Sequence, residues 1–238
     1  MVIEFILLLM AAYLLGSVPT AYLAAKWSRG IDIRKYGSGN VGASNVLAVV
    51  SKRWSVPVAL FDLAKGMIVV WVAQLLGLGI TQQVAVGLAA IIGHNWSVFL
   101  HFNGGRGIFT SGGVIIILSP WLGLIAPVLA YLFAPFRQLP LGTTIALLSL
   151  PILSWSLSQP LGIDEPLPVT LGYLAILFIA MLRRITAPRT SFTASVSSGE
   201  LIINRLLFDR DIRDRKAWIS RTPDEQSSTE QSPEPEDK

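Results

Sequence analysis

Hydrophobic positions along this chain come in long blocks that are separated by short polar stretches. A bilayer core of about 30 Å requires roughly 20 apolar residues in a helix. Because the blocks reach or approach this length, we expect them to cross a membrane as helices. The five uninterrupted blocks are residues 2–25, 56–78, 84–100, 139–157 and 167–182.

A sixth apolar region, residues 108–134, is interrupted by Ser119-Pro120. If the chain turns there, all basic loops fall on one side of the membrane, and the loops 77–81 and 158–166 fall on the other. Lys and Arg are enriched in cytosolic loops. The pattern therefore predicts an all-α, polytopic membrane protein with seven transmembrane helices, some of them short, with the N-terminus outside and the C-terminus cytosolic. The basic residues that set this orientation are Lys26, Arg29, Arg34, Lys35, Lys52, Arg53, Arg106, Arg137, Arg183 and Arg184.

The composition agrees with a membrane protein. The chain has 238 residues, of which 52% are hydrophobic and 14% charged, against about 25% charged in soluble domains. Residues 1–185 carry eleven Lys and Arg against five Asp and Glu, whereas residues 186–238 carry eight against ten. The positive excess lies in short loops between spans, which excludes nucleic acid as a partner. The absence of Cys excludes disulfides, thiolate metal sites and thiol nucleophiles.

Composition also divides the chain into three parts. Residues 1–185 are the predicted transmembrane domain. Residues 186–219 combine a Ser/Thr-rich stretch with an amphipathic one, which is predicted to lie on the cytosolic membrane surface or to cap a site there. Residues 220–238 are rich in Pro, Ser and Glu and almost lack apolar side chains, which is typical of a disordered acidic tail.

The first cytosolic loop contains a dense run of small and polar residues. The spacing of Gly37, Gly39 and Gly42 matches a dinucleotide-binding fingerprint, but no βαβ unit surrounds it, so that interpretation fails. Small residues still allow successive backbone N–H groups to cradle a phosphate. The sequence therefore predicts either a phosphate site or a turn without a ligand. Polar and charged groups for the phosphate site come from Arg34, Lys35, Ser38, Asn40, Ser44 and Asn45.

A second polar cluster follows the third span. Three glycines surround an arginine in the order Gly104, Gly105, Arg106, Gly107. A tight turn of this kind presents a guanidinium beside exposed amides, and Arg binds phosphate through two parallel hydrogen bonds. His94 and His101 are seven residues apart without Cys or carboxylates nearby, so we expect no metal site. His94 is as compatible with an interfacial histidine whose hydrogen bonds are satisfied as with substrate binding.

Three charged residues near the membrane each allow two interpretations. Asp62 and Lys65 are three residues apart in the second span, so they share a helix face and form a structural ion pair or bind substrate. Arg137 is either a topology anchor or a phosphate ligand.

Four segments of the chain carry a family resemblance. Residues 16–23, 32–45, 62–66 and 93–110 read GSVPTAYL, DIRKYGSGNVGASN, DLAKG and GHNWSVFLHFNGGRGIFT. In this order they resemble the bacterial acyl-phosphate:glycerol-3-phosphate acyltransferases, the PlsY family, over about residues 5–185. The resemblance implies a membrane enzyme of phospholipid biosynthesis that needs no cofactor. It would transfer a fatty acyl group from acyl phosphate to the sn-1 hydroxyl of glycerol 3-phosphate, giving lysophosphatidic acid.

The resemblance also implies roles for individual residues. The donor phosphate and carbonyl are expected at Ser38, Gly39, Asn40 and Asn45, and the acceptor phosphate at Arg106 with Thr143 and Arg205. The family lacks a protein base, which implies that a substrate phosphate takes the hydroxyl proton. Nothing in the chain resembles a Ser–His–Asp triad, so we expect no acyl-enzyme. The residues expected to be catalytic are Ser38, Asn40 and Arg106. The predicted substrate-binding residues are Arg34, Gly37, Gly39, Gly42, Asn45, Lys65, His94, Gly104, Gly105, Gly107, Thr110, Arg137, Thr143 and Arg205.

The chain departs from the family pattern at several positions. Arg106 stands where the family usually has Lys, and Ala48 where it usually has Arg. In the third motif Gly199 and Ile202 replace His and Asn, and Asp209 replaces Gly. These differences leave an alternative open, namely a non-catalytic or acceptor-altered homologue that binds lipid phosphates or a membrane partner. In either case we expect a multi-pass protein of the bacterial inner membrane with its active face cytosolic.

Overall fold

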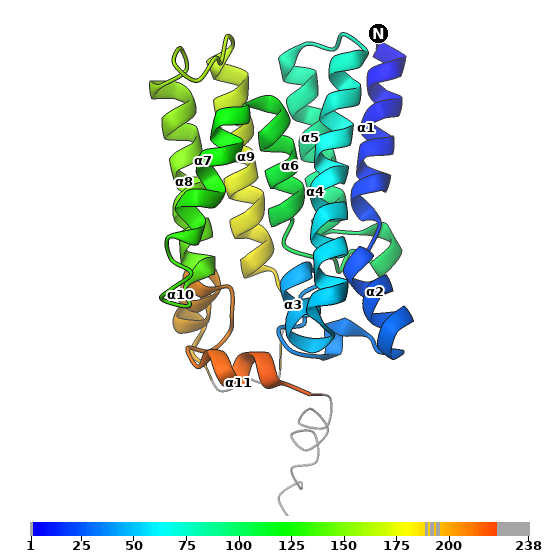
Figure 1. Ribbon diagram of the computed structural model, residues 1–238, viewed down its shortest axis with the longest axis vertical. Helices are drawn as coiled ribbons and strands as arrows, with labels where there is room; N and C mark the ends of the chain where they lie inside the picture. Colours follow the sequence, from blue (N-terminus) through cyan, green and yellow to red (C-terminus); the bar gives the residue numbers. More distant parts are fainter. Residues whose placement is uncertain (1, 189, 191–192, 194–195, 223–238) are drawn as a thin grey trace, which may run out of the picture.

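The computed structural model describes residues 2–188, 190, 193 and 196–222, and the regular structure within these ranges is helical (Figure 1). Residues 223–238, most of the predicted acidic tail, lie outside the described residues. The helices in chain order are α1 (Val2–Ser17), α2 (Thr20–Arg29), η1 (Ile33–Lys35), α3 (Ala43–Val49), α4 (Lys52–Leu75), α5 (Ile80–Asn95), η2 (Val98–Leu100), α6 (Ile108–Leu118), α7 (Pro120–Tyr131), α8 (Leu139–Ser156), α9 (Pro166–Ile185), α10 (Ser198–Phe208) and α11 (Arg215–Ser220).

The long helices stand side by side as a bundle (Figure 1). Two shorter apolar helices, α6 and α7, stand among them. This arrangement confirms an all-helical, multi-pass membrane architecture, while the count of seven crossings stays a prediction. Within the described residues, five segments are long and apolar enough to cross a membrane, namely Val2–Arg29, Lys52–Leu75, Ile80–Leu100, Leu139–Ser156 and Pro166–Ile185.

The first span is broken, whereas the sequence predicted one helix over residues 2–25. Helix α1 ends at Ser17 and α2 begins at Thr20. Pro19 explains the break, because it has no N–H to donate and its ring disfavours a helical conformation in the residue before it. The carbonyl oxygens of Gly16 and Val18 at the break accept hydrogen bonds from Lys65 Nζ at 2.9 and 3.3 Å.

The second break is the one that the sequence predicts at Ser119-Pro120. Helix α6 ends at Leu118 and α7 begins at Pro120, which occupies the first helical turn, where a missing N–H costs no hydrogen bond. The junction points toward the same end of the bundle as the α4–α5 and α8–α9 connections (Figure 1).

Helices α4 and α6 pack backbone against backbone. A Cβ on Gly66 would collide with the carbonyl oxygen of Thr110, and one on Gly113 would collide with that of Leu63. Val70 and Val114, both buried, continue the contact into the core. This close packing fixes the start of α6, and therefore the turn that precedes it, against α4.

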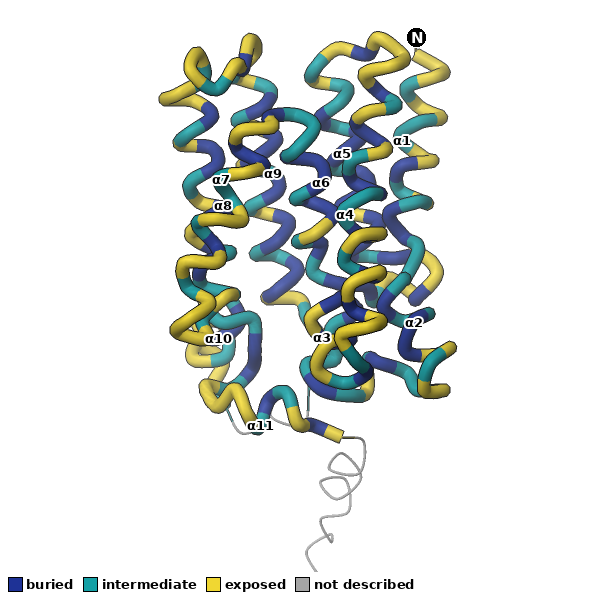
Figure 2. Tube along the Cα trace, viewed as in Figure 1, coloured by how far each residue is buried: buried dark blue, intermediate teal, exposed yellow. Residues whose placement is uncertain are grey.

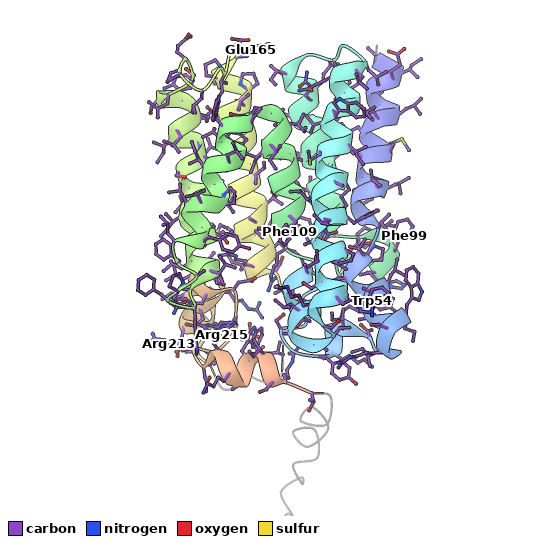
Figure 3. All side chains as sticks on the ribbon, in the orientation of Figure 1. Trp54, Phe99, Phe109, Glu165, Arg213 and Arg215 are labelled. Atoms are coloured by element: carbon purple, nitrogen blue, oxygen red, sulfur yellow. The ribbon has the colours of Figure 1, made fainter. Side chains whose placement is uncertain are left out.

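The outer surface and the two ends of the bundle differ in character. Figure 2 shows exposed residues along the outer faces of the helices. Many of the exposed side chains are large and apolar, as a hydrocarbon environment requires. Figure 3 shows Glu165 at one end and Arg213 and Arg215 at the other. We call the latter the basic end; it carries α2, α3, α10 and α11 (Figure 1).

Candidate active site

Asn45 shapes the glycine loop, which we define as residues 36–42. Its side-chain oxygen accepts a hydrogen bond from the N–H of Ser38 at 3.1 Å. Its side-chain nitrogen donates to the carbonyl oxygens of Ile33 and Tyr36 at 3.2 and 3.0 Å. Asn45 is buried in the first turn of α3. The sequence predicts that Asn45 binds phosphate, but these contacts show that its amide is bonded to the backbone around the loop.

The backbone N–H groups of the glycine loop are already engaged. The N–H of Gly37 donates to the carbonyl oxygen of Arg221 at 2.9 Å, and that of Gly39 donates to a carbonyl within the loop at 3.0 Å. The N–H of Asn40 donates to Ser38 Oγ at 3.3 Å. The expected cradle of successive free N–H groups is therefore absent from residues 37–40. The half-buried side chains of Ser38 and Asn40 are the polar groups that this part of the loop offers to a ligand.

Arg34, which the sequence predicts to bring charge to the loop, is bound to Asp32. The Asp32 carboxylate accepts hydrogen bonds from the Arg34 backbone N–H, Nε and Nη2, and the shortest of them is 2.7 Å. These bonds hold the pKa of the Asp32 carboxyl below its usual value, and the carboxylate raises the pKa of the Arg34 guanidinium. The charge of Arg34 is thus compensated within the pair.

The arginine turn, which we define as residues 103–107, folds back onto the end of α5. The N–H groups of Gly104 and Gly105 donate to carbonyl oxygens of α5 at 3.2 and 3.0 Å. A Cβ on Gly105 would collide with the ring of His94 and with the carbonyl oxygen of Val41. Since Val41 belongs to the glycine loop, the two predicted phosphate sites are in direct contact at the basic end.

Arg183, in the last turn of α9, holds the arginine turn from the other side. Its Nε donates to the carbonyl oxygen of Gly105 at 3.1 Å. Its Nη2 donates to the carbonyl oxygen of Gly104 at 2.8 Å and to the side-chain oxygen Oδ1 of Asn103 at 3.3 Å. The side chain is buried. The sequence predicts only a role in orientation for Arg183, because nothing in its local pattern indicates a bond to a residue 78 positions earlier.

Arg106 points from the turn toward α9 and α10. Its Nη1 donates to the carbonyl oxygen of Arg183 at 2.9 Å, and its Nε forms an ion pair with Asp209 Oδ1 at 2.7 Å. Asp209 caps α10 in the left-handed conformation, with φ of 52°. An anion that binds Arg106 must therefore share the guanidinium with this carboxylate or displace it.

Asp62 and Lys65 form the ion pair that their spacing predicts, with 2.9 Å between Nζ and Oδ1. Both are buried, and Thr20 donates a hydrogen bond to Asp62 at 2.8 Å. His94 Nδ1 lies 3.7 Å from Asp62 Oδ1 and 3.4 Å from the Thr110 hydroxyl. The cluster joins α1, α2, α4, α5 and α6 next to the arginine turn. These contacts favour structural roles for Lys65 and His94.

The three remaining predicted residues lie toward α8 and α10. Arg205 is buried, and its nitrogens bond to Asp211 Oδ1 at 2.7 Å and to three carbonyl oxygens after α9 at 2.7 to 3.2 Å. Arg137 is exposed just before α8, and Thr143 is half-buried near the start of that helix, where its hydroxyl donates to the carbonyl oxygen of Leu139 at 2.9 Å. Within the described ranges, the hydrogen bond and the ion pair of Arg106 go to Arg183 and Asp209 and not to these three residues.

The arrangement defines a class of protein. An apolar helical bundle carries two adjoining polar loops at one end, which suits a membrane protein that acts on amphipathic anions. Among the residues that the structure describes, no three His, Asp or Glu side chains are grouped so as to hold a metal ion.

Comparison with known proteins then gives the family. The family model described as glycerol-3-phosphate acyltransferase matches residues 6–189, so the chain belongs to that family. Glycerol-3-phosphate acyltransferase 4 of Dehalococcoides mccartyi (strain CBDB1) is 45% identical over 217 residues, which cover 91% of this chain and 94% of the relative. Glycerol-3-phosphate acyltransferase 5 of Dehalococcoides mccartyi (strain ATCC BAA-2266 / KCTC 15142 / 195) is 45% identical over 221 residues, 93% of this chain and 95% of the relative.

Two crystal structures share the fold. Both are of PlsY, described as an integral membrane glycerol 3-phosphate acyltransferase. The glycerol 3-phosphate form has a TM-score of 0.71 and 30% identity, and the match covers 88% of this chain and 95% of that one. The lysophosphatidic acid form has a TM-score of 0.69 and 29% identity, with 91% and 98% covered. The resemblance to the PlsY family that the motifs indicated is thus confirmed.

Proposed function

We propose that this chain transfers a fatty acyl group from acyl phosphate to the sn-1 hydroxyl of glycerol 3-phosphate, which yields lysophosphatidic acid and inorganic phosphate. The observation that carries the proposal is the contact of the glycine loop with the arginine turn, through Val41 and Gly105. Both substrates carry a phosphate, and the donor has an acyl chain that stays in lipid. Two adjoining polar loops at the end of an apolar bundle meet both requirements.

The reaction needs positioning more than covalent help from the protein. Acyl phosphate is a mixed anhydride, so its carbonyl carbon is already activated. The acceptor oxygen forms an ester bond to that carbon, the bond from the carbon to the phosphate oxygen breaks, and the hydroxyl proton leaves with the phosphate. Ser38 and Asn40 donate hydrogen bonds to the donor, and Arg106 binds the acceptor phosphate. Orientation and electrostatic stabilisation then lower the barrier.

Other residues of the site act by holding these groups in place. Asn45 fixes the glycine loop, and Arg183 fixes the arginine turn. His94 supports Gly105 from the side of α5. Lys65 ties the broken first span to α4. We assign Arg205 a similar role at the junction of α9 and α10, since Asp211 and neighbouring carbonyl oxygens bind its guanidinium.

We assign the basic end to the cytosolic face of a bacterial inner membrane, with seven crossings and the N-terminus outside. The support is the charge distribution, because Lys and Arg are enriched in cytosolic loops. The basic residues that flank the spans adjoin the basic end, for example in α2 and in the last turn of α9. The connections at the other end, residues 76–79 and 157–165, contain no Lys or Arg, and the second carries Asp164 and Glu165.

One observation favours the alternative of an acceptor-altered homologue. The ion pair of Arg106 with Asp209 places a carboxylate where an acceptor phosphate would bind. Like charges repel, so Asp209 weakens phosphate binding unless it moves away.

The test is an assay of the purified protein in lipid bilayers with palmitoyl phosphate, with and without glycerol 3-phosphate. We expect lysophosphatidic acid to form only when glycerol 3-phosphate is present, with NMR placing the ester at the sn-1 carbon. If the protein consumes palmitoyl phosphate only with a different acceptor, the acceptor-altered alternative is correct. If it binds both substrates without turnover, it is a non-catalytic homologue.

A further inference from the structure

Arg106 and Asp209 meet at ion-pair distance but without the alignment of a hydrogen bond. The distance from Arg106 Nε to Asp209 Oδ1 is 2.7 Å. Both atoms are buried, and among the described residues neither atom has a hydrogen-bond partner. A contact of this length weakens steeply when the N–H does not point at the oxygen. Charge attraction therefore holds the pair, without the two parallel hydrogen bonds that make a guanidinium–carboxylate contact strong.

The backbone of Asp209 is fixed, whereas part of its side chain borders solvent. Asp209 follows the last turn of α10, and its N–H donates to the carbonyl oxygen of Arg205 at 3.1 Å. Its φ of 52° lies in the left-handed region. The Asp209 side chain is 22% exposed. A rotation of this side chain toward solvent therefore releases Arg106 without a movement of α10.

Three arginines gather where α9 and α10 meet the arginine turn. The carbonyl oxygen of Arg183 accepts a hydrogen bond from Arg106. Arg184 donates to neutral acceptors, among them the carbonyl oxygen of Leu206 in the last turn of α10. Arg183 and Arg184 are buried and form no ion pair within the described residues. The group therefore keeps a positive excess with Asp209 in place, and it attracts an anion of higher charge than one carboxylate more strongly.

We propose that Asp209 is a displaceable counter-ion of Arg106: it occupies the guanidinium while the site is empty, and the acceptor phosphate takes its place. This inference rests on the proposed function, because it takes glycerol 3-phosphate as the anion at Arg106. A phosphate monoester carries up to two negative charges and binds guanidinium N–H groups in parallel, so it outcompetes a single misaligned carboxylate.

Such a contact is autoinhibitory. Only those molecules in which Asp209 has turned away can bind an anion at Arg106, and the apparent affinity falls by the fraction of molecules in that state. The reduction is the same for every anion that needs Arg106, whatever its own charge. Removal of the carboxylate should therefore tighten binding, whereas removal of a side chain that supports the site would weaken it.

The test compares wild type with Asp209→Asn, Asp209→Gly and the control Asp214→Asn. Asparagine and glycine both adopt the left-handed conformation that position 209 requires. Asp214 is exposed at the same end, and its replacement removes the same charge, while asparagine preserves the cap that this side chain provides for α11. Calorimetry in lipid bilayers, without an acyl donor, gives the Kd of each protein for glycerol 3-phosphate and for glycerol 3-sulfate, which carries one negative charge fewer.

We expect both Asp209 variants to lower the Kd for glycerol 3-phosphate by roughly 2- to 5-fold, which corresponds to the strength of a part-exposed ion pair. The Kd for glycerol 3-sulfate should fall by the same factor, because Asp209 leaves before either anion binds. Asp214→Asn should match wild type. In an Arg106→Ala background, Asp209→Asn should give no gain, since the two side chains then no longer interact.

Asp209 does not compete with the acceptor if Asp209→Asn binds glycerol 3-phosphate no more tightly than wild type does. Displacement is also wrong if glycerol 3-phosphate gains more than glycerol 3-sulfate, since the carboxylate then stays beside the bound anion and repels the higher charge more. Thermal unfolding shows whether each variant folds, and Asp209→Gly decides if Asp209→Asn does not. A wild type that makes no lysophosphatidic acid, together with tighter glycerol 3-phosphate binding by Asp209→Asn, contradicts the proposed function and supports displacement.

Discussion

Arg183 donates three hydrogen bonds to the arginine turn, and Asn45 makes three with the backbone in and around the glycine loop. Both side chains are buried, so truncating either leaves polar groups unpaired, at about 1–3 kcal/mol for each. Residues of this kind determine the shape of the site. Ser38, Asn40 and Arg106 differ from them, because we expect their side chains to bind the substrates.

Ser38→Ala and Asn40→Ala should reduce donor use without unfolding the protein. Loss of a hydrogen-bond donor in a transition state costs about 10²–10³ in rate. The measurement is kcat/KM for palmitoyl phosphate, with thermal unfolding in parallel. Ser198→Ala is the control, because Ser198 is an exposed serine of α10 at the same end of the bundle. If either variant turns over at the normal rate, the glycine loop has a purely structural role.

Arg106→Lys should raise the KM for glycerol 3-phosphate, and Arg106→Ala should raise it further. The guanidinium binds the Arg183 carbonyl and Asp209 through two different nitrogens, which a single ammonium group reproduces poorly. The control is Arg213→Ala, which removes an exposed arginine from the same end. If Lys matches Arg, the fork is unimportant; if Ala matches both, Arg106 does not bind the acceptor.

At the scale of the helices, the close packing of α4 against α6 fixes the position of the site relative to the core. Helix α4 carries the Asp62–Lys65 pair, and α6 begins directly after the arginine turn. These helices approach closely at Gly66 and Gly113. Interiors are packed without spare volume, so a methyl group added between these helices would push α6 away from α4. The arginine turn, which directly precedes α6, would move with it.

Gly113→Ala should therefore lower the thermal unfolding temperature and the activity together. Its Cβ would meet the backbone carbonyl of Leu63, which cannot rotate away, and overpacking of this kind costs about 1–3 kcal/mol. Gly112→Ala is the control, because its Cβ would lie 3.4 Å from the Leu63 Cδ1 atom, an ordinary contact. Equal unfolding temperatures for the two variants contradict the close packing of α4 and α6.

The helices and some pairings could be predicted from sequence because they depend on local patterns. Apolar length predicts the spans, Ser119-Pro120 predicts the break between α6 and α7, and a spacing of three predicts the ion pair of Asp62 with Lys65. The break in the first span also has a local cause, Pro19, but the apolar block around it obscured that signal.

The contacts that define the site depend on long-range packing and could not be predicted in this way. Small residues at 37–42 indicate a loop that can approach a phosphate, but not that its N–H groups are bonded elsewhere. The charge of Arg183 predicts orientation, but not its bonds to Gly104 and Gly105. Nothing in residues 215–222 shows that Arg221 reaches Gly39.

At the scale of the whole molecule, Arg213 and Arg215 lie at one end of the bundle and Glu165 lies at the other (Figure 3). A membrane protein with its Lys and Arg at one end is expected to insert with that end in the cytosol. With that orientation, we expect both substrates of the proposed reaction to reach the site from the side where phosphorylated metabolites occur, while the acyl chain stays in the bilayer.

Single cysteines introduced into this Cys-free chain should report that orientation. We expect a membrane-impermeant maleimide, added to intact cells, to label Gln159→Cys and to leave Ser44→Cys unlabelled until the membrane is permeabilised. Both positions are exposed, so access does not limit the reaction. If Ser44→Cys is labelled from outside the cell, the orientation is the opposite of the one that we propose.

The identity of the acyl donor is the most direct test of the proposed function. Purified protein is given glycerol 3-phosphate with palmitoyl phosphate, palmitoyl-CoA or palmitoyl-acyl carrier protein as the sole donor, and lysophosphatidic acid and inorganic phosphate are measured together. We predict that palmitoyl phosphate alone supports the reaction, with one phosphate released for each lysophosphatidic acid formed. Lysophosphatidic acid made from either thioester, with palmitoyl phosphate left unused, would contradict it.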